Sequence, residues 1–211
     1  MGLVMVLSAS SPSALSESGN SYAFFSKQLI FAILGIIAML FISKIDYRFY
    51  QKFYKHAWWI ALILLALVLI AGRTVNGAKR WIFVTETLSF QPSEVVKILM
   101  IIFYAGILVK NRDELGLYTK GFIKNMCLLA PIIGLLLLEP HFSASIVIIG
   151  ICATMMIMAG CKFWLFLATG AVAGIPAMIL LIVKEPYRLQ RVITFLDPWK
   201  DATGDGWQVI Q

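Results

Sequence analysis

Among the residues of this sequence that could do chemistry, the strongest candidate is a lysine inside an apolar segment. Lys97 follows the motif Gln-Pro-Ser-Glu at 91–94 and lies within the long apolar run that the motif opens. Proline is favoured at the first position of a helix, so the motif predicts a helix capped by Gln91 with Glu94 as its third residue. Glu94 then lies near the positive end of the helix dipole, on the same face as Lys97.

Glu94 and Lys97 allow two interpretations. An ion pair within a capped helix start explains Glu94 well, because a carboxylate is stabilised at that end of a helix. The same ion pair explains Lys97 less well, since charged side chains within a membrane usually face a bundle interior or a hydrated cavity and mark function. We therefore favour a functional role for Lys97 and leave both roles open for Glu94.

A basic and aromatic stretch precedes this helix, with Lys79, Arg80 and Trp81 in succession. One interpretation is an interfacial belt, in which Trp81 lies at the level of the lipid headgroups and the cations reach toward water. The other interpretation is a phosphate site, in which Lys79 and Arg80 hold a pyrophosphate and the guanidinium donates two hydrogen bonds. The sequence leaves both open.

A short turn with a carboxylate separates two later apolar segments and reads Glu139-Pro140-His141. A carboxylate at this depth is costly unless it is paired, and its partner would be Lys97 or Arg80. If the turn instead lies at the surface, the Glu139 carboxylate is simply hydrated. Both interpretations stay open.

The C-terminal stretch forms a second polar cluster. Apolar residues at helical spacing within 189–196 lie opposite Arg188 and Arg191, which predicts an amphipathic helix at the membrane interface. The segment after it is rich in Asp, Gly and Pro and predicts a turn. Its carboxylates could serve acid–base chemistry, but we favour a turn-stabilising role for Asp197, Asp201 and Asp205.

The elements that must position these residues are membrane spans. The 211 residues are 60% hydrophobic and only 14% charged, with a mean hydropathy of +0.86, whereas a soluble domain carries about 25% charged residues. The net charge of +7 is dispersed among apolar segments, which favours contact with anionic lipid and argues against nucleic acid. The three cysteines lack CxxC spacing and argue against both a disulfide framework and a metal site.

The apolar segments predict an all-α, polytopic membrane protein, with residues 1–211 as a single membrane domain. We count seven segments: a stub at 1–8, then after a polar loop the spans 28–43, 57–72, 94–110, 126–138, 142–160 and 163–183. Residues 184–211, which follow the last span, are expected to begin a loop outside the cytoplasm. In the last span, Gly170 and Gly174 predict a packing face for another helix, and Pro176 predicts a kink.

The distribution of basic residues predicts the orientation. Residues 44–56 and 110–124 each carry four Lys or Arg, and Lys162 lies in the tight turn between the last two spans. These connections are therefore expected in the cytoplasm. The stretches 73–93 and 184–211 are expected outside, where the basic residues are nearly as many but are spread over a longer length.

Three stretches together resemble the SEDS family (shape, elongation, division and sporulation), which includes FtsW, RodA and SpoVE. They are the opening GLVMVLSASSPSA, the stretch NGAKRWI…FQPSEVVK and the C-terminal PYRLQRVITFLDPWKDATGDGWQVIQ. The resemblance runs along the whole chain and is closer to the FtsW/SpoVE division branch than to RodA. It implies a multi-pass protein of the bacterial plasma membrane, from a family with about ten spans.

The resemblance implies a peptidoglycan glycosyltransferase that polymerises lipid II, an undecaprenyl-pyrophosphate-linked disaccharide peptide, into glycan strands. The implied partners are lipid II, a class B penicillin-binding protein that crosslinks the strands, and other membrane proteins of the division complex. A cofactor is not specified, and a divalent cation is left open. The implied substrate-binding residues are Arg80, Trp81, Gln91, Ser93, Glu94, Lys97, Glu139, Arg188 and Arg191.

The sequence departs from the family pattern at several points. The first span is a stub, and the chain ends at Gln211, before the Thr-Asp-Phe-Ile-like motif that holds the family's essential aspartate. The resemblance therefore implies a fragment without a catalytic residue, inactive alone. The family's Gln-Pro-Asp-Leu-Gly-Thr turn reads EPHFSA here, with His141 at the aspartate position.

Two hypotheses of other classes accompany the glycosyltransferase. The first is a lipid II flippase or a transporter whose pathway Glu94, Lys97 and Glu139 would line, although no inverted repeat supports it. The second is a non-catalytic scaffold of the division complex, which would not require a lysine within the membrane.

Overall fold

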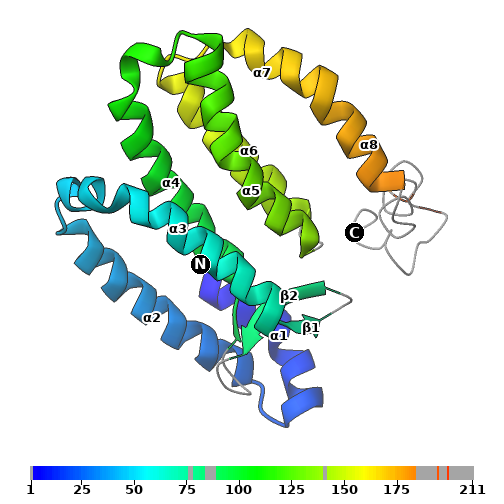
Figure 1. Ribbon diagram of the computed structural model, residues 1–211. Coiled ribbons are helices and arrows are strands. Elements are labelled where there is room, and N and C mark those ends of the chain that lie inside the picture. Colours follow the sequence, from blue (N-terminus) through cyan, green and yellow to red (C-terminus); the bar gives the residue numbers. More distant parts are fainter. Residues whose placement is uncertain are drawn as a thin grey trace. The chain divides into compact units, whose positions relative to one another are not determined.

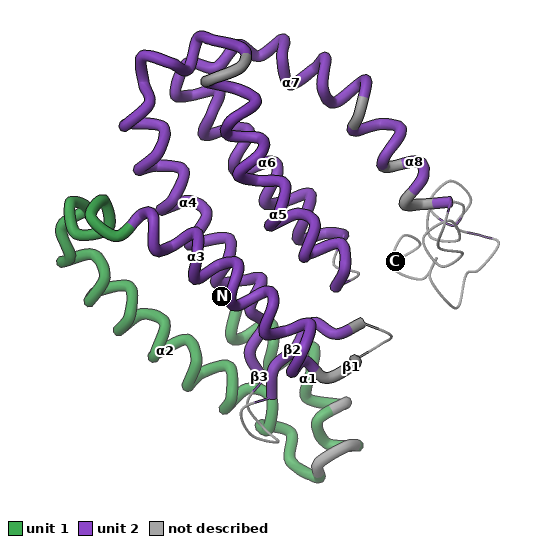
Figure 2. The backbone as a smooth tube through the Cα atoms, viewed as in Figure 1, with its two compact units in different colours: residues 1–53 green, residues 54–211 purple. Residues whose placement is uncertain are grey.

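The computed structural model describes residues 2–75, 78–83, 89–139 and 142–183, together with Thr194 and Trp199. Within this part, helices dominate, and the chain divides into two compact units, Met1–Phe53 and Tyr54–Gln211 (Figure 2). The boundary between the units falls within one helix. Each unit is described by itself.

The first unit holds α1 (Gly2–Ser18), α2 (Ala23–Ser43) and the first residues of α3 (Tyr47–Ala71), with α1 packed against α2 (Figure 1). The sequence predicted a short helical stub at 1–8 followed by a polar loop. This prediction was wrong, because α1 continues through Pro12 to Ser18. The Ser10 hydroxyl donates a hydrogen bond of 2.6 Å to the Val6 carbonyl. A serine side chain satisfied by its own helix does not interrupt it.

The connection between α2 and α3 is much shorter than the loop expected at 44–56. The backbone N–H of Arg48 donates to the Asp46 carboxylate at 2.9 Å, so Asp46 caps α3 and the helix begins at Tyr47 rather than at 57. The basic residues expected in a loop therefore lie mainly in the first turns of α3. No residue of α2 is buried, and most of its apolar side chains are exposed.

A three-stranded antiparallel sheet opens the second unit after α3 and was not expected for an all-α chain. It consists of β1 (Arg73–Val75), β2 (Ala78–Phe83) and β3 (Ser89–Phe90), in that order. Val75 pairs with Ala78, and the two residues between them are Asn-Gly, the strongest short sequence signal for a hairpin. The sheet is small, so the fold remains an α-helical one.

Five helical elements follow the sheet. They are α4 (Pro92–Lys110), the 3₁₀-helix η1 (Arg112–Glu114), the π-helix η2 (Tyr118–Ile123), α5 (Lys124–Leu138) and α6 (Phe142–Met158). Helix α6 packs against both α4 and α5. One apolar core joins α3 to these helices, with Leu65, Met100, Ile132 and Ile148 among its fully buried residues.

Two hydrogen bonds and one close contact hold α3, α4 and α5 together. The Trp58 indole N–H donates to the Leu128 carbonyl at 2.9 Å, and the Tyr104 hydroxyl donates to the Asn125 carbonyl at 2.7 Å. A side chain on Gly106 would collide with the ring of Tyr54, so glycine allows α3 and α4 to approach closely here.

Helix α6 ends in a glycine turn. Gly160 has φ 112°, and the N–H of Cys161 donates to the Met156 carbonyl at 3.0 Å while that of Gly160 donates to Ile157 at 3.0 Å. These two backbone hydrogen bonds form a Schellman motif, which needs a residue with positive φ. It places Lys162 in the tight turn that the sequence predicted.

The last helical run consists of α7 (Phe163–Thr169), the π-helix η3 (Gly170–Gly174) and α8 (Ile175–Val183). A π-helical turn lies directly before Pro176, where the sequence predicted a kink. The packing face expected at Gly170 and Gly174 is not used within the described chain, where no atom lies within 4 Å of a Cβ built at either glycine.

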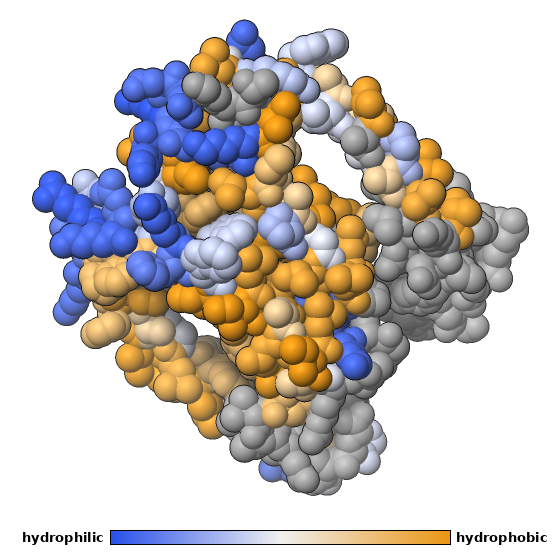
Figure 3. Space-filling model, in the orientation of Figure 1, coloured by the Kyte–Doolittle hydropathy of each residue, from blue (hydrophilic) through white to orange (hydrophobic). Residues whose placement is uncertain are grey.

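The predicted polytopic architecture is confirmed. Among the described residues, four helices are long and apolar enough to cross a membrane: Ala23–Ser43, Tyr47–Ala71, Pro92–Lys110 and Gly121–Leu138. Shorter apolar helices at Gly2–Pro12, Phe142–Met158 and Phe163–Ala177 match the remaining segments that the sequence predicted. In Figure 3 the flanks of the helices are hydrophobic, and hydrophilic residues gather over the connection between α4 and α5.

Candidate functional site

The start of α4 has the predicted geometry. Gln91 is the N-cap residue, Pro92 is the first helical residue, and the Glu94 N–H donates to the Gln91 carbonyl at 3.1 Å. The Gln91 side chain makes no capping hydrogen bond. The carboxylate of Glu94 therefore stands in the first turn, where the helix dipole stabilises a negative charge.

Glu94 and Lys97 form the ion pair that one interpretation of the sequence predicted. The Lys97 Nζ lies 2.8 Å from Glu94 Oε2, and the side chains are 25% and 58% exposed, respectively. The lysine is thus the more enclosed member of the pair. An exposed carboxylate holds it in place, and a ligand anion that reached Lys97 would compete with that carboxylate.

Beside this pair, the Ser93 side chain is buried at 1% exposure. Its hydroxyl finds no hydrogen-bond partner among the described residues. A buried hydroxyl without a partner is costly unless another group satisfies it. The first turn of α4 therefore presents an unused polar atom next to a charged pair.

Strand β2 supplies Arg80 from a β-bulge. In the pairing with β1, Trp81 lies opposite Arg73 while Lys79 lies opposite Thr74, so Arg80 takes the extra position. Bulges change the direction in which a side chain points and are common next to functional sites. Strand β2 lies against α4, which brings this part of the sheet to the end of the bundle where α4 begins.

Glu139, directly after α5, is buried with only 1% of its surface exposed. Its Oε1 atom finds no hydrogen-bond partner among the described residues. Burial raises the pKa of Glu139 to about 7, and the positive charge of Arg80 opposes this rise. The two hypotheses for Glu139 are thereby separated, because the carboxyl is enclosed near Arg80 rather than hydrated at the surface.

The structure thus gathers most of the candidate residues at one end of the second unit. The start of α4 contributes Ser93, Glu94 and Lys97, the strand contributes Arg80, and the end of α5 contributes Glu139. Between Lys97 and Arg80 as partners for Glu139, the positive charge that acts on the carboxyl is that of Arg80. Trp81 is half-buried and lies in the middle of β2.

Several predicted residues lie outside the described part of the chain. These are His141, Arg188, Arg191 and the three aspartates Asp197, Asp201 and Asp205. Within the described ranges, no group of three or more His, Cys, Asp or Glu could hold a metal ion. Sequence reasoning missed the sheet and its bulge, although the Asn-Gly pair at 76–77 is a hairpin signal.

Comparison with known proteins places this arrangement in a family. The sequence model of the FtsW/RodA/SpoVE family, described as cell cycle proteins, matches residues 1–211. The chain is 37% identical to the probable peptidoglycan glycosyltransferase FtsW of Aliivibrio salmonicida (strain LFI1238), over 100% of its own length and 52% of that protein. It is 34% identical to stage V sporulation protein E of Bacillus subtilis (strain 168), over 100% of this chain and 58% of that protein.

A solved structure agrees in fold. A chain of a peptidoglycan synthase complex, in which polymerization and crosslinking are coordinated, superposes with a TM-score of 0.73 at 25% sequence identity. The match covers 99% of this chain and 62% of that one. The chain therefore spans about half the length of the curated relatives it matches, and it is a multi-pass protein of the bacterial plasma membrane.

Proposed function

Because the chain belongs to the FtsW/RodA/SpoVE family of cell cycle proteins, we propose that it is part of a peptidoglycan glycosyltransferase. Its substrate would be lipid II, which the enzyme polymerises into glycan strands during division and cell-wall synthesis. One observation carries the proposal: the chain aligns along its whole length, at 37% identity, with the probable peptidoglycan glycosyltransferase FtsW of A. salmonicida.

The proposed reaction joins two lipid-linked disaccharides. The 4-hydroxyl of one sugar attacks the anomeric carbon of the other, a base accepts the hydroxyl proton, and undecaprenyl pyrophosphate leaves with the electrons of the broken C–O bond. The reaction needs a base at the hydroxyl and positive charge at the departing phosphates. The resemblance implies an aspartate further along the outer loop as the base.

The outer end of the second unit supports the proposal with its positive charges. Lys97 is held at the rim of the bundle by Glu94, at 2.8 Å, and Arg80 is set on a bulge near Glu139. We assign the pyrophosphate to Lys97 and Arg80, because cations in a site of low dielectric stabilise developing negative charge most effectively. The Ser93 hydroxyl, which has no hydrogen-bond partner among the described residues, would donate a hydrogen bond to the same ligand.

The remaining substrate contacts follow from the resemblance. Trp81, Gln91 and Glu139 would line the sugar side of the site, and Arg188 and Arg191 would add positive charge from the outer loop. The proposed partners are a class B penicillin-binding protein and other membrane proteins of the division complex. Support comes from the similar chain of a peptidoglycan synthase complex, in which polymerization and crosslinking are coordinated.

The test is polymerisation of purified lipid II by the full-length protein, without any other polymerase present. We expect glycan strands from the wild type. The variant Lys97→Met keeps the apolar stem of the side chain and removes its charge, and we expect a rate at least about a hundredfold lower. The matched control Lys162→Met removes a charge from the exposed turn after α6 and should leave the rate unchanged.

A double variant separates substrate binding from structure. If Lys97 only balances Glu94, then Lys97→Met leaves a carboxylate unpaired, and adding Glu94→Gln restores the activity. If Lys97 binds the pyrophosphate, the double variant Lys97→Met with Glu94→Gln makes no glycan strands. Detergent thermal melts should show that this variant is still folded. A well-folded wild type that produces no strands would contradict the glycosyltransferase and favour a transport or scaffold function.

A further inference from the structure

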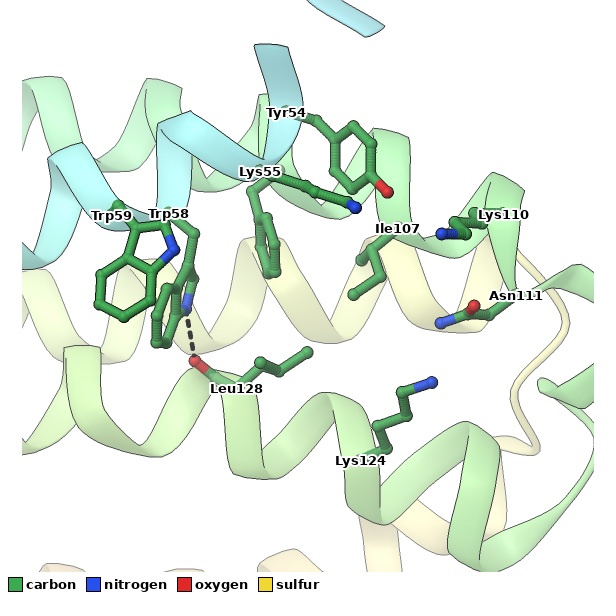
Figure 4. A pocket seen from close by; sticks show the side chains of 10 residues that line it. Tyr54, Lys55, Trp58, Trp59, Ile107, Lys110, Asn111, Lys124 and Leu128 are labelled. Carbon is green, nitrogen blue, oxygen red and sulfur yellow. Dashed lines mark hydrogen bonds between the residues drawn. The ribbon is translucent and has the colours of Figure 1, made fainter. Parts of the chain in front are cut away.

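A second polar site lies at the other end of α4 from the candidate functional site. A pocket of about 320 Å³ opens there between the first half of α3, the end of α4 and the start of α5 (Figure 4). Small-molecule sites in proteins have volumes of about 300–1,000 Å³. The pocket is therefore large enough for a phosphate with its attached polar group.

Three ammonium groups converge on this pocket. They belong to Lys55 of α3, Lys110 of α4 and Lys124 of α5, and Figure 4 shows them on one side of the pocket together with the Asn111 amide. Lys124 has a carboxylate nearby, Glu114 Oε2, at 3.7 Å. Among the described residues, Lys55 and Lys110 form no salt bridge. The pocket thus carries an excess of positive charge, which a ligand anion would neutralise.

Two tryptophans form the opposite wall. The Trp58 indole is fixed by its 2.9 Å hydrogen bond to the Leu128 carbonyl, and its ring meets that of Trp59 edge-on at 4.9 Å. Tryptophan at this level is typical of the interface between lipid tails and headgroups. The wall is therefore aromatic, with one of its rings held by a hydrogen bond, and it faces the cluster of lysines across the pocket.

The surroundings of the pocket distinguish a lipid from a soluble anion. Trp59 begins a stripe of exposed apolar side chains along α3, which Ile63 and Leu67 continue at intervals of four residues. The three side chains are 61%, 61% and 42% exposed. A soluble phosphate would use only the lysines, whereas a phospholipid would also place its acyl chains along this stripe.

We propose that this pocket binds the phosphate headgroup of an anionic phospholipid from the adjacent membrane leaflet. The three lysines and Asn111 hold the phosphate, the tryptophans border the glycerol, and the acyl chains follow α3. Basic pockets between membrane helices are a known means of binding such headgroups. The site is separate from the proposed lipid II site, which lies at the opposite end of α4.

Native mass spectrometry of the detergent-solubilised chain tests the proposal. The chain is titrated with phosphatidylglycerol and with zwitterionic phosphatidylcholine of the same acyl chains. The pocket variant combines Lys55→Gln, Lys110→Gln and Lys124→Gln. We expect it to bind the first phosphatidylglycerol at least about tenfold more weakly than the wild type, since each cation near anionic lipid contributes several-fold in affinity.

Matched variants separate the pocket from general charge. Lys44→Gln, Lys52→Gln and Lys162→Gln remove the same charge from exposed lysines that do not line the pocket, and this control should keep wild-type affinity. The pocket variant with arginine in place of each lysine should also keep it. If the triple variant does not fold, the single variants Lys55→Gln and Lys110→Gln should each weaken binding by a few-fold.

Three results would overturn the proposal. The first is unchanged phosphatidylglycerol binding in a folded pocket variant. The second is an equal loss in the control variant, which would mean that surface charge alone attracts the lipid. The third is competition by inorganic phosphate as strong as that by short-chain phosphatidylglycerol, which would identify the ligand as a soluble anion.

Discussion

At the residue scale, the end of the second unit where α4 begins holds buried polar atoms that no described residue satisfies. The Ser93 hydroxyl and the Glu139 Oε1 atom are both buried and find no hydrogen-bond partner among the described residues. Such atoms cost stability and are retained where a ligand or another part of the protein uses them. Their position beside Lys97 and Arg80 is consistent with a site for an anionic substrate.

The raised pKa of Glu139 predicts that the stability of the protein depends on pH. Its pKa is about 7 in the folded chain, against an ordinary value of 4.5, because burial penalises the charged carboxylate. Between pH 4.5 and 7, the Glu139 carboxyl is protonated in the folded state and ionised in the unfolded state. The free energy of unfolding therefore falls as the pH rises through this range. The loss amounts to about 3 kcal/mol at most.

Detergent melts of the wild type and of Glu139→Gln between pH 4.5 and 8 measure this effect. We expect the melting temperature of the wild type to decrease over the interval and that of Glu139→Gln to change much less. Glu114→Gln, at a more exposed carboxylate, is the control and should behave as the wild type does. A pH dependence that persists in Glu139→Gln would assign it to another group.

The sequence predicted the charged pair of α4 more completely than it predicted the rest of the site. The Gln-Pro-Ser-Glu motif determines the cap and the face that Glu94 and Lys97 share, because both are properties of a single helix. The approach of Arg80 to Glu139 depends on a bulge and on the packing of a strand against α4. Contacts between distant elements of this kind have no short-range signal, so the sequence could only name Arg80 as one of two partners.

At the element scale, the same division explains what the sequence predicted of the fold. The seven segments are strongly apolar, and among the described residues four of the helices are long enough to span a membrane, so their existence and order followed from hydropathy. Their ends were less predictable, since Asp46 caps α3 well before its apolar part and α1 continues through a serine-rich stretch. Local hydrogen bonds decide helix ends, and hydropathy does not detect them.

The close approach of α3 and α4 depends on a glycine. A Cβ at Gly106 would fall on the first atoms of the Tyr54 ring, which cannot move without its helix. We expect Gly106→Ala to separate the two helices and to cost about 1–3 kcal/mol. At Gly134 on α5, no atom lies within 4 Å of the new methyl group, so Gly134→Ala should be neutral or stabilising by up to about 1 kcal/mol.

Detergent melts of both alanine variants compare the two glycines directly. A smaller residue at Tyr54 should recover part of the loss in Gly106→Ala, because the collision disappears with the ring. Equal melting temperatures for Gly106→Ala and Gly134→Ala would show that α3 and α4 do not depend on this contact.

At the scale of the whole molecule, the two polar ends of the second unit differ in character. The end where α4 begins combines cations with carboxyl groups and a sheet, whereas the other end presents lysines, tryptophans and the connection through η1 and η2. Basic residues on short connections remain in the cytoplasm during insertion. The orientation of the bundle therefore decides which membrane leaflet the proposed lipid II site and the proposed phospholipid pocket each face.

Single-cysteine labelling determines that orientation. The background is a variant in which Cys127, Cys152 and Cys161 are replaced. Two single-cysteine variants then place a thiol at an exposed position at either end of α4: Ser89→Cys on β3 and Gly116→Cys between η1 and η2. A membrane-impermeant reagent added to intact spheroplasts should label Ser89→Cys alone, because the α4–α5 connection carries the dense positive charge. After permeabilisation, both variants should react, which verifies that each thiol is accessible. Labelling of Gly116→Cys in intact spheroplasts would reverse the orientation, and with it would move the proposed lipid II site to the cytoplasmic leaflet.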